Sequence, residues 1–309
     1  MFLKTVKIFL SLILFAFSTV GQINMEDSTV QVVGYWYKGD TQSYTISDEK
    51  YKVNGTDTTD RSFFTYDVDI LIKDSTADSY TIEWKYSNYK IDSSENVFLK
   101  KILSIFQDLS VEMKMNEMGG IIEVINWKQI QEYANNAFEV LKKELKNIPN
   151  IDAVLQQAKH SFSSQEAIQA NAIKDAIQYY NYHGGKYKLG ETLTSNLQLQ
   201  NNYGGPPFDT DIQVVLDEIN LEEGNAILKM FQSVDSKQLT DATYDYLVKM
   251  SKSMDLELPP RDVFPPLKNE TFTGSRIHGG TGWVIYSIET KEVIAEGIQN
   301  IEERIIMLK

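Results

Sequence analysis

The three histidines of this chain are the first residues to consider for catalysis or metal binding. His160, His183 and His278 lie far apart and form no HExxH or HxH pattern, so the spacing typical of a zinc site is absent. We expect His183, which precedes Gly184 at a predicted helix end, to be structural, because a cation is favourable there. The histidines therefore predict no metal site, and we assign no cofactor and no catalytic residue from the sequence.

Arg276 and His278 precede a glycine-rich segment, residues 279–282. In a loop between strands, both side chains could face an anionic group of a ligand. The alternative is a polar hairpin tip whose glycines serve only the backbone conformation. A hydrolase-like site built from this pair and nearby carboxylates is the least favoured interpretation, since the sequence contains no GxSxG motif.

Three carboxylates lie on one polar face of a predicted hairpin. Asp67, Asp69 and Glu83 could collect a hard cation, which prefers oxygen ligands. Lys85 lies on the same face. Period-two alternation alone places such charges on a solvated surface, and we prefer that interpretation.

Aromatic residues are abundant, with 17 Tyr, 14 Phe and 4 Trp. Tyrosine and tryptophan bring a polar tip into an apolar wall, which suits a pocket for an apolar or amphipathic ligand. They also suit an ordinary core, because aromatic residues are favoured in strands. With the basic pair above, the candidate ligand-binding residues are Tyr66, Tyr80, Trp84, Tyr86, Tyr286, Arg276 and His278.

The first part of the chain carries the alternation of strands that bury one face. It predicts a four-stranded meander over residues 30–37, 43–53, 64–73 and 80–86. The later strands are predicted at residues 188–200, 211–220, 226–234, 269–277, 283–288 and 293–307, with a turn at 289–292.

Helical periodicity dominates between these two sets of strands. A helix capped near Ser93 is followed by a hairpin over 111–125 and by helices at 127–145, from Ile151, and from a Ser163–Glu166 capping box through Tyr180. Asp235 caps a later helix. Residues from about 93 to 184 thus form a mostly helical insertion.

Strands at both ends with helices between them indicate an α+β fold. We expect a single domain, residues 22–309, in which the terminal strands close onto the meander as a large curved antiparallel sheet. The helical insertion would cover the concave face of this half-barrel-like sheet. We expect Ala134 and Ala176 to face the hollow between the two.

The first 21 residues are typical of a secretory signal peptide. Lys4 and Lys7 precede an apolar run at residues 8–17, and small residues lead to Gly21, after which we expect cleavage. The run is too short to span a bilayer comfortably, although a retained N-terminal anchor is the alternative. We expect no transmembrane span after cleavage.

The amino-acid composition excludes several kinds of site and disfavours two kinds of binding partner. The chain contains no cysteine, which excludes disulfides, thiol catalysis and thiolate metal sites. Its formal net charge of −13 disfavours binding to nucleic acid or to an anionic membrane surface.

The chain resembles a group of exported bacterial proteins built on a lipoprotein-carrier-like half-barrel. The resemblance rests on the signal peptide, the strands around Gly39-Asp40, the hairpins described above, and the closing Gly282-Trp283 hairpin. It implies a curved sheet whose hollow takes acyl chains, and a location in the bacterial periplasm or outside the cell.

Three functions are compatible with these observations. The first is an envelope protein that binds a lipid-like or other apolar small molecule, or an envelope protein partner, in a groove between sheet and helices. The second is a structural or interaction protein with a filled core, and the third is the hydrolase-like site. We expect the first. The sequence leaves the oligomeric state open.

Overall fold

The computed structural model describes residues 22–91, 109–147, 151–201, 203, 205–254 and 258–309. The strands are β1 (Ile23–Asn24), β2 (Thr29–Gln31), β3 (Thr41–Asn54), β4 (Asp57–Ser75), β5 (Ser79–Ile91), β6 (Ser110–Asn116), β7 (Ile121–Val124), β8 (Lys186–Lys188), β9 (Thr192–Leu199), β10 (Phe208–Asn220), β11 (Asn225–Val234), β12 (Lys268–His278), β13 (Val284–Ala295) and β14 (Ile298–Leu308). The helices are α2 (Trp127–Glu144), α3 (Ile151–His160), α4 (Gln165–Asn171), α5 (Lys174–Tyr180) and α6 (Ser236–Met254), with a 3₁₀ turn at Arg261–Val263.

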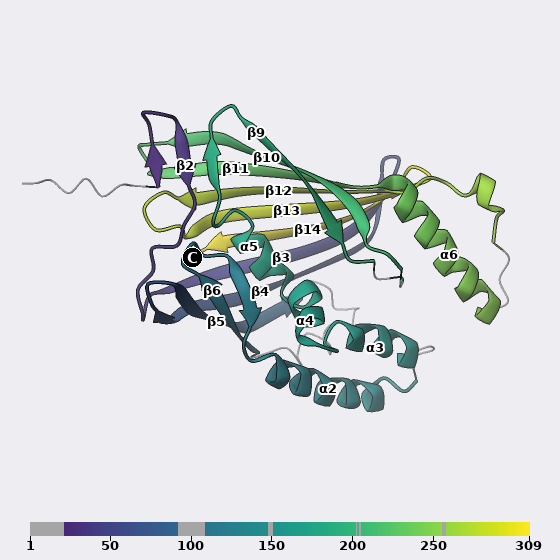
Figure 1. Cartoon of the computed structure of the whole chain (residues 1–309). Coiled ribbons are helices and arrows are strands. Elements are labelled where there is room, and N and C mark those ends of the chain that lie inside the picture. Colours follow the sequence, from purple (N-terminus) through teal and green to yellow (C-terminus); the bar gives the residue numbers. More distant parts are fainter. Residues whose placement is uncertain (1–21, 92–108, 148–150, 202, 204, 255–257) are drawn as a thin grey trace, which may run out of the picture.

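A large antiparallel sheet forms the body of the fold (Figure 1). Its eleven strands run in the order β7-β6-β5-β4-β3-β14-β13-β12-β11-β10-β9. The last strand, β14, pairs with β3 along its length, for example Arg304 with Asp48. The C-terminal strands therefore join the first meander in one sheet, as the sequence predicted.

The helices that follow the first meander lie against this sheet. α2 contacts β6, α4 contacts β7, and α5 contacts β13 and β14, while α6 packs separately against β10 and β12 (Figure 1). The fold is thus the predicted α+β class, a curved antiparallel sheet covered by helices. The helix expected from Ser93 lies outside the described residues.

The predicted strand at 30–37 is wrong. Only Thr29–Gln31 forms a strand, and it belongs to a small second sheet with β1 and β8. The backbone beyond it bonds to loops instead of strands, since the Val32 amide donates to Gly185 and the Tyr35 amide to Thr281. The meander therefore begins at β3.

Two later boundaries also differ. The strand predicted at 188–200 is split between the two sheets, because Gly190 adopts a left-handed conformation (φ 81°). The turn predicted at 289–292 lies within β13. The reversal occurs at Glu296–Gly297, both with positive φ (50° and 78°), which is the geometry that joins twisted strands in two-residue hairpins. The polar and charged residues at 289–292 favoured a turn in the sequence-based prediction, although they lie within the strand.

The helix predicted from Ser163 through Tyr180 is two helices. Ser164, and not Ser163, caps α4, where its hydroxyl accepts from the Ala167 amide at 3.1 Å. Ile173 then leaves helical geometry (φ −116°, ψ 42°) and is buried in the main core. This break sets the position of the α5 side chains above the sheet.

Aromatic residues from sheet and helix form the centre of the core. Trp84 is 1% exposed, and its ring meets Tyr179 of α5 edge-on, with centroids 5.4 Å apart. Trp36 packs against Tyr80 and Trp283. The contact between Trp84 and Tyr179 holds α5 against the sheet.

Candidate functional site

A cavity of about 390 Å³ lies between the sheet and the helices α2 to α5, beside this core. Its size falls within the usual range of small-molecule sites, about 300–1,000 Å³. Most of its wall is aromatic or aliphatic: Phe64, Tyr66, Tyr86 and Tyr89 from the strands, and Ile130, Phe138, Leu155, Phe162, Ile168 and Ala172 from the helical side.

Alternation along β4 and β5 builds the strand side of this wall. Phe64 and Tyr66 lie two residues apart and share a face, with ring centroids 6.0 Å apart. Tyr66 also meets Tyr86 at 5.9 Å and Tyr89 at 5.1 Å. The strands therefore present a continuous aromatic surface to the cavity.

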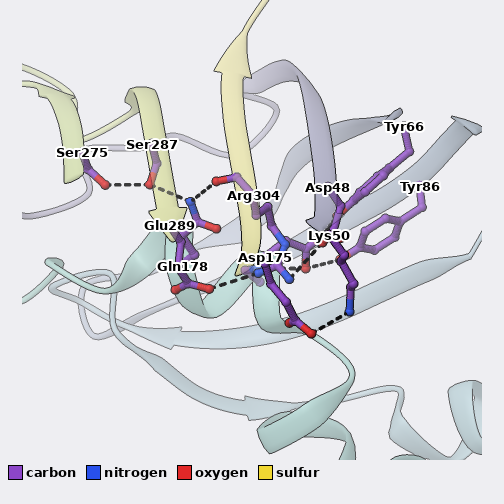
Figure 2. Close-up of polar contacts among 12 residues, drawn as sticks. Asp48, Lys50, Tyr66, Tyr86, Asp175, Gln178, Ser275, Ser287, Glu289 and Arg304 are labelled. Atoms are coloured by element: carbon purple, nitrogen blue, oxygen red, sulfur yellow. Dashed lines mark hydrogen bonds and ion pairs between the residues drawn. The ribbon is translucent and has the colours of Figure 1, made fainter. Parts of the chain in front are cut away.

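Asp175 brings a carboxylate to this surface from the first turn of α5. The Tyr66 hydroxyl donates to its Oδ2 and the Tyr86 hydroxyl to its Oδ1, both at 3.0 Å (Figure 2). Asp175 is 5% exposed. Burial, and then the Asp175 charge, raise the pKa of both tyrosines, so their hydroxyls stay protonated and donate.

A second polar group lies on the sheet at the same end of the cavity. The Arg304 guanidinium is 3.3 Å from Oδ2 of Asp48 and 3.4 Å from Oε1 of Glu289 (Figure 2). Burial raises the pKa of both carboxyl groups, and the positive charge of Arg304 opposes that shift. Arg304 thus has a carboxylate partner on each neighbouring strand.

Gln178 connects α5 to this part of the sheet. Its side-chain amide nitrogen donates to the Ser287 hydroxyl at 3.0 Å and to the Arg304 carbonyl at 3.3 Å. Ser275 donates in turn to Ser287 at 2.8 Å (Figure 2). The helix that carries Asp175 is therefore held in register with the strand that carries Arg304.

The cavity is amphipathic as a result. Aromatic and aliphatic side chains form most of the wall, and its charged residues are Asp48, Lys174, Asp175 and Arg304. Such a wall can accept an apolar chain with a polar group at its end. Among the described residues, no group of three or more acidic or histidine side chains is placed to hold a metal ion.

Two of the predicted site residues, Tyr66 and Tyr86, line this cavity. Tyr80 and Trp84 are buried in the neighbouring core instead. The Tyr80 hydroxyl donates to the Gly34 carbonyl at 2.7 Å, and the Trp84 indole donates to the Tyr180 hydroxyl at 3.2 Å. These two side chains therefore belong to the packed core and do not line the cavity.

The other three predicted residues lie on β12 and β13, away from the cavity lining. Arg276 is opposite Tyr286 in the strand pairing and lies 3.7 Å from Glu223. His278 shares a hydrogen bond with the Thr281 hydroxyl at 2.9 Å. This arrangement fits the polar hairpin tip that the sequence offered as the alternative.

The three carboxylates of the predicted hairpin face are engaged separately. Asp67 is 2.8 Å from the Lys309 amine, Asp69 accepts from Ser43 at 2.5 Å, and Glu83 accepts from Ser110 at 2.6 Å. They do not converge on one point.

His183 is buried in the aromatic core, where its Nε2 bonds the Gly282 carbonyl at 2.9 Å. Burial lowers its pKa to about 4, so the ring is neutral near neutral pH. The expected structural role thus depends on packing and not on a positive charge at the helix end.

Sequence reasoning missed the charged residues of the cavity. Asp48 lies two residues from Ile46, and Arg304 two residues from Ile306, so alternation placed both on the inward face. Lys174 and Asp175 follow the helix break, which the sequence did not indicate. Ala134 and Ala176, expected to face the hollow, are fully buried and do not line it.

No protein-family model matches this sequence, and no curated protein matches it. Among solved structures, the chain is similar to lipovitellin, in a structure described as showing lipid–protein interactions. The TM-score is 0.41 at 9% sequence identity, over 88% of this chain and 25% of that chain. This chain thus spans about a quarter of the lipovitellin chain.

Within the described residues, none of the helices is long and apolar enough to cross a membrane.

Proposed function

We propose that this protein is an exported, non-enzymatic protein that binds an amphipathic ligand in the cavity between the sheet and helices α2 to α5. The observation that carries the proposal is the cavity itself, about 390 Å³ with a mainly apolar wall and a polar end. Burial of an acyl chain there would contribute about 0.8 kcal/mol for each CH₂ group removed from water.

The sequence of residues 1–21 supports export, and the half-barrel resemblance supports the bacterial envelope as the location. An apolar ligand site suits that location, because lipid-like molecules need a protein to shield them from the aqueous space between membranes.

A dansyl-labelled undecanoate titrated into delipidated, folded protein tests the proposal. We expect a saturable rise in fluorescence with one site per chain. Ala172→Trp should abolish this rise, because Ala172 lines the cavity and is partly exposed, so an indole can enter the empty space. Ala158→Trp, from α3, is a second blocking variant on the same grounds.

Ala77→Trp is the matched control, since Ala77 lies in the exposed turn between β4 and β5 and does not line the cavity. It should bind the probe as the unmodified protein does. A folded protein that fails to bind any acyl probe would contradict the proposal and favour the structural alternative. Equal binding by the Ala172→Trp variant would place the ligand elsewhere.

A further inference from the structure

Two lysines lie beside the cavity and interact with the acids around them, Glu302 and Glu289, only through longer-range charge interactions. Lys174 lines the cavity at the start of α5. Lys291 lies two residues after Glu289 on β13, on the same face of the sheet. Neither makes a hydrogen bond or ion pair with a residue that the structure describes. Desolvation lowers the pKa of Lys174, the charge of Glu302 opposes this shift, and the charge of Lys291 adds to it.

The acidic residues around them are already engaged. Glu302, opposite Lys291 on β14, is 3.0 Å from the Lys50 amine. The remaining acids of this region accept from the tyrosines or pair with Arg304: Asp48, Asp175 and Glu289. An incoming anion would therefore reach both lysines without breaking a hydrogen bond or ion pair of theirs, and it would compete there only with the longer-range charges of Glu302 and Glu289.

We infer that the ligand of this cavity is a long-chain carboxylate, with its chain against the aromatic wall and its carboxylate held by Lys174 and Lys291. This inference rests on the proposed function and adds the chemical class of the ligand. A carboxylate between the two lysines relieves their mutual repulsion, and charge-assisted hydrogen bonds are roughly twice as strong as neutral ones. The exposed end of Lys174 makes this contribution sensitive to salt.

Isothermal titration of the delipidated protein with three ligands of equal chain length tests this inference. The ligands are dodecanoate and dodecyltrimethylammonium, each below its micelle concentration, and dodecanol below its solubility limit. We expect dodecanoate to bind at least about tenfold more tightly than the other two, since a hydrogen bond to a charged group contributes enough for that factor. Acetate should not compete, because it lacks the chain.

Substitution of the two lysines distinguishes the contribution of the ligand's carboxylate to binding from that of its apolar chain. Lys174→Met with Lys291→Met should weaken dodecanoate to the level of dodecanol and leave dodecanol unchanged, whereas arginine at both positions should keep the preference. Lys249→Met, which removes a charge from the exposed face of α6, is the control and should change neither ligand.

The outcomes distinguish the two claims. If dodecanol binds as tightly as dodecanoate, or the double methionine variant keeps the preference, the carboxylate assignment is overturned while the cavity remains a binding site. Competition by acetate at similar concentration would show a simple anion site and also overturn it. If no chain ligand binds, the proposed function fails and this inference fails with it.

Discussion

The hydroxyl of Tyr66 donates a hydrogen bond to Oδ2 of Asp175, and this 3.0 Å contact joins β4 to α5. The Tyr86 hydroxyl makes the matching contact to Oδ1 from β5. One carboxylate on a seven-residue helix thus anchors that helix to two strands. It also fixes one wall of the cavity.

Removing the shared acceptor should therefore destabilise the fold. Asp175→Ala leaves two buried hydroxyls without an acceptor, and we expect the free energy of unfolding to fall by about 2 kcal/mol or more. Urea denaturation measures this change. Combining Asp175→Ala with phenylalanine at both tyrosines should restore part of the loss, because the unpaired hydroxyls are gone. A triple variant less stable than Asp175→Ala would contradict this account.

The aromatic wall was predictable because period-two alternation needs no tertiary information. The same pattern that placed Tyr66 and Tyr86 on an inward face also placed Asp48 there, but a charged residue at such a position suggests a solvated surface. The positive charge of Arg304, more than 250 residues away in the sequence, compensates for the burial of Asp48. Sequence spacing cannot show that pairing.

The α5 residues were missed for a different reason. Local periodicity runs smoothly from α4 into α5, and only the burial of Ile173 in the main core interrupts it. Because the break rotates the following helix, the direction of Lys174 and Asp175 depends on a tertiary contact. A helical wheel that treats residues 163–180 as one continuous helix therefore gives these two residues the wrong orientation.

Trp84 tests the assignment of strand faces. It is 1% exposed and packs against Tyr179 and Tyr180, so Trp84→Ala should cost about 3–5 kcal/mol through lost burial and the cavity left behind. Lys85→Ala, on the opposite and exposed face, should stay within about 0.5 kcal/mol. Chemical denaturation compares the two, and equal midpoints would refute the face assignment.

His183 gives the stability a pH dependence with a defined sign. Its pKa is about 4 in the folded protein against an ordinary 6.5, so the unfolded chain takes up the proton first as the pH falls. Stability from the neutral ring is complete above about pH 6.5 and is lost towards pH 4, a change of about 3 kcal/mol.

The measurement is the free energy of unfolding at several pH values, compared between the unmodified protein and His183→Gln. The difference between the two should shrink as the pH falls through this window. His160→Gln, at an exposed histidine, is the control for loss of an imidazole ring and should change the free energy of unfolding little. A difference that is independent of pH would show that His183 is not buried as a neutral ring.

Export can be tested at the N-terminus of the protein purified from its source. We expect the mature chain to begin at Gln22, whose amide already donates to the Gly279 carbonyl at 3.0 Å within the fold. N-terminal sequencing or intact mass measurement decides this point. A chain that begins at Met1 and sediments with membranes would favour the retained anchor.

We expect an apolar chain to occupy the cavity between the sheet and the helices. The most direct test is a crystal structure of the delipidated protein with dodecanoate brominated at its terminal carbon, because anomalous scattering distinguishes bromine from the lighter atoms of the protein. We predict one bromine peak against Ile130, Phe138 and Leu155, on the helical side of the cavity. A peak at another place on the molecule, or an unoccupied cavity with bound ligand elsewhere, would contradict the account.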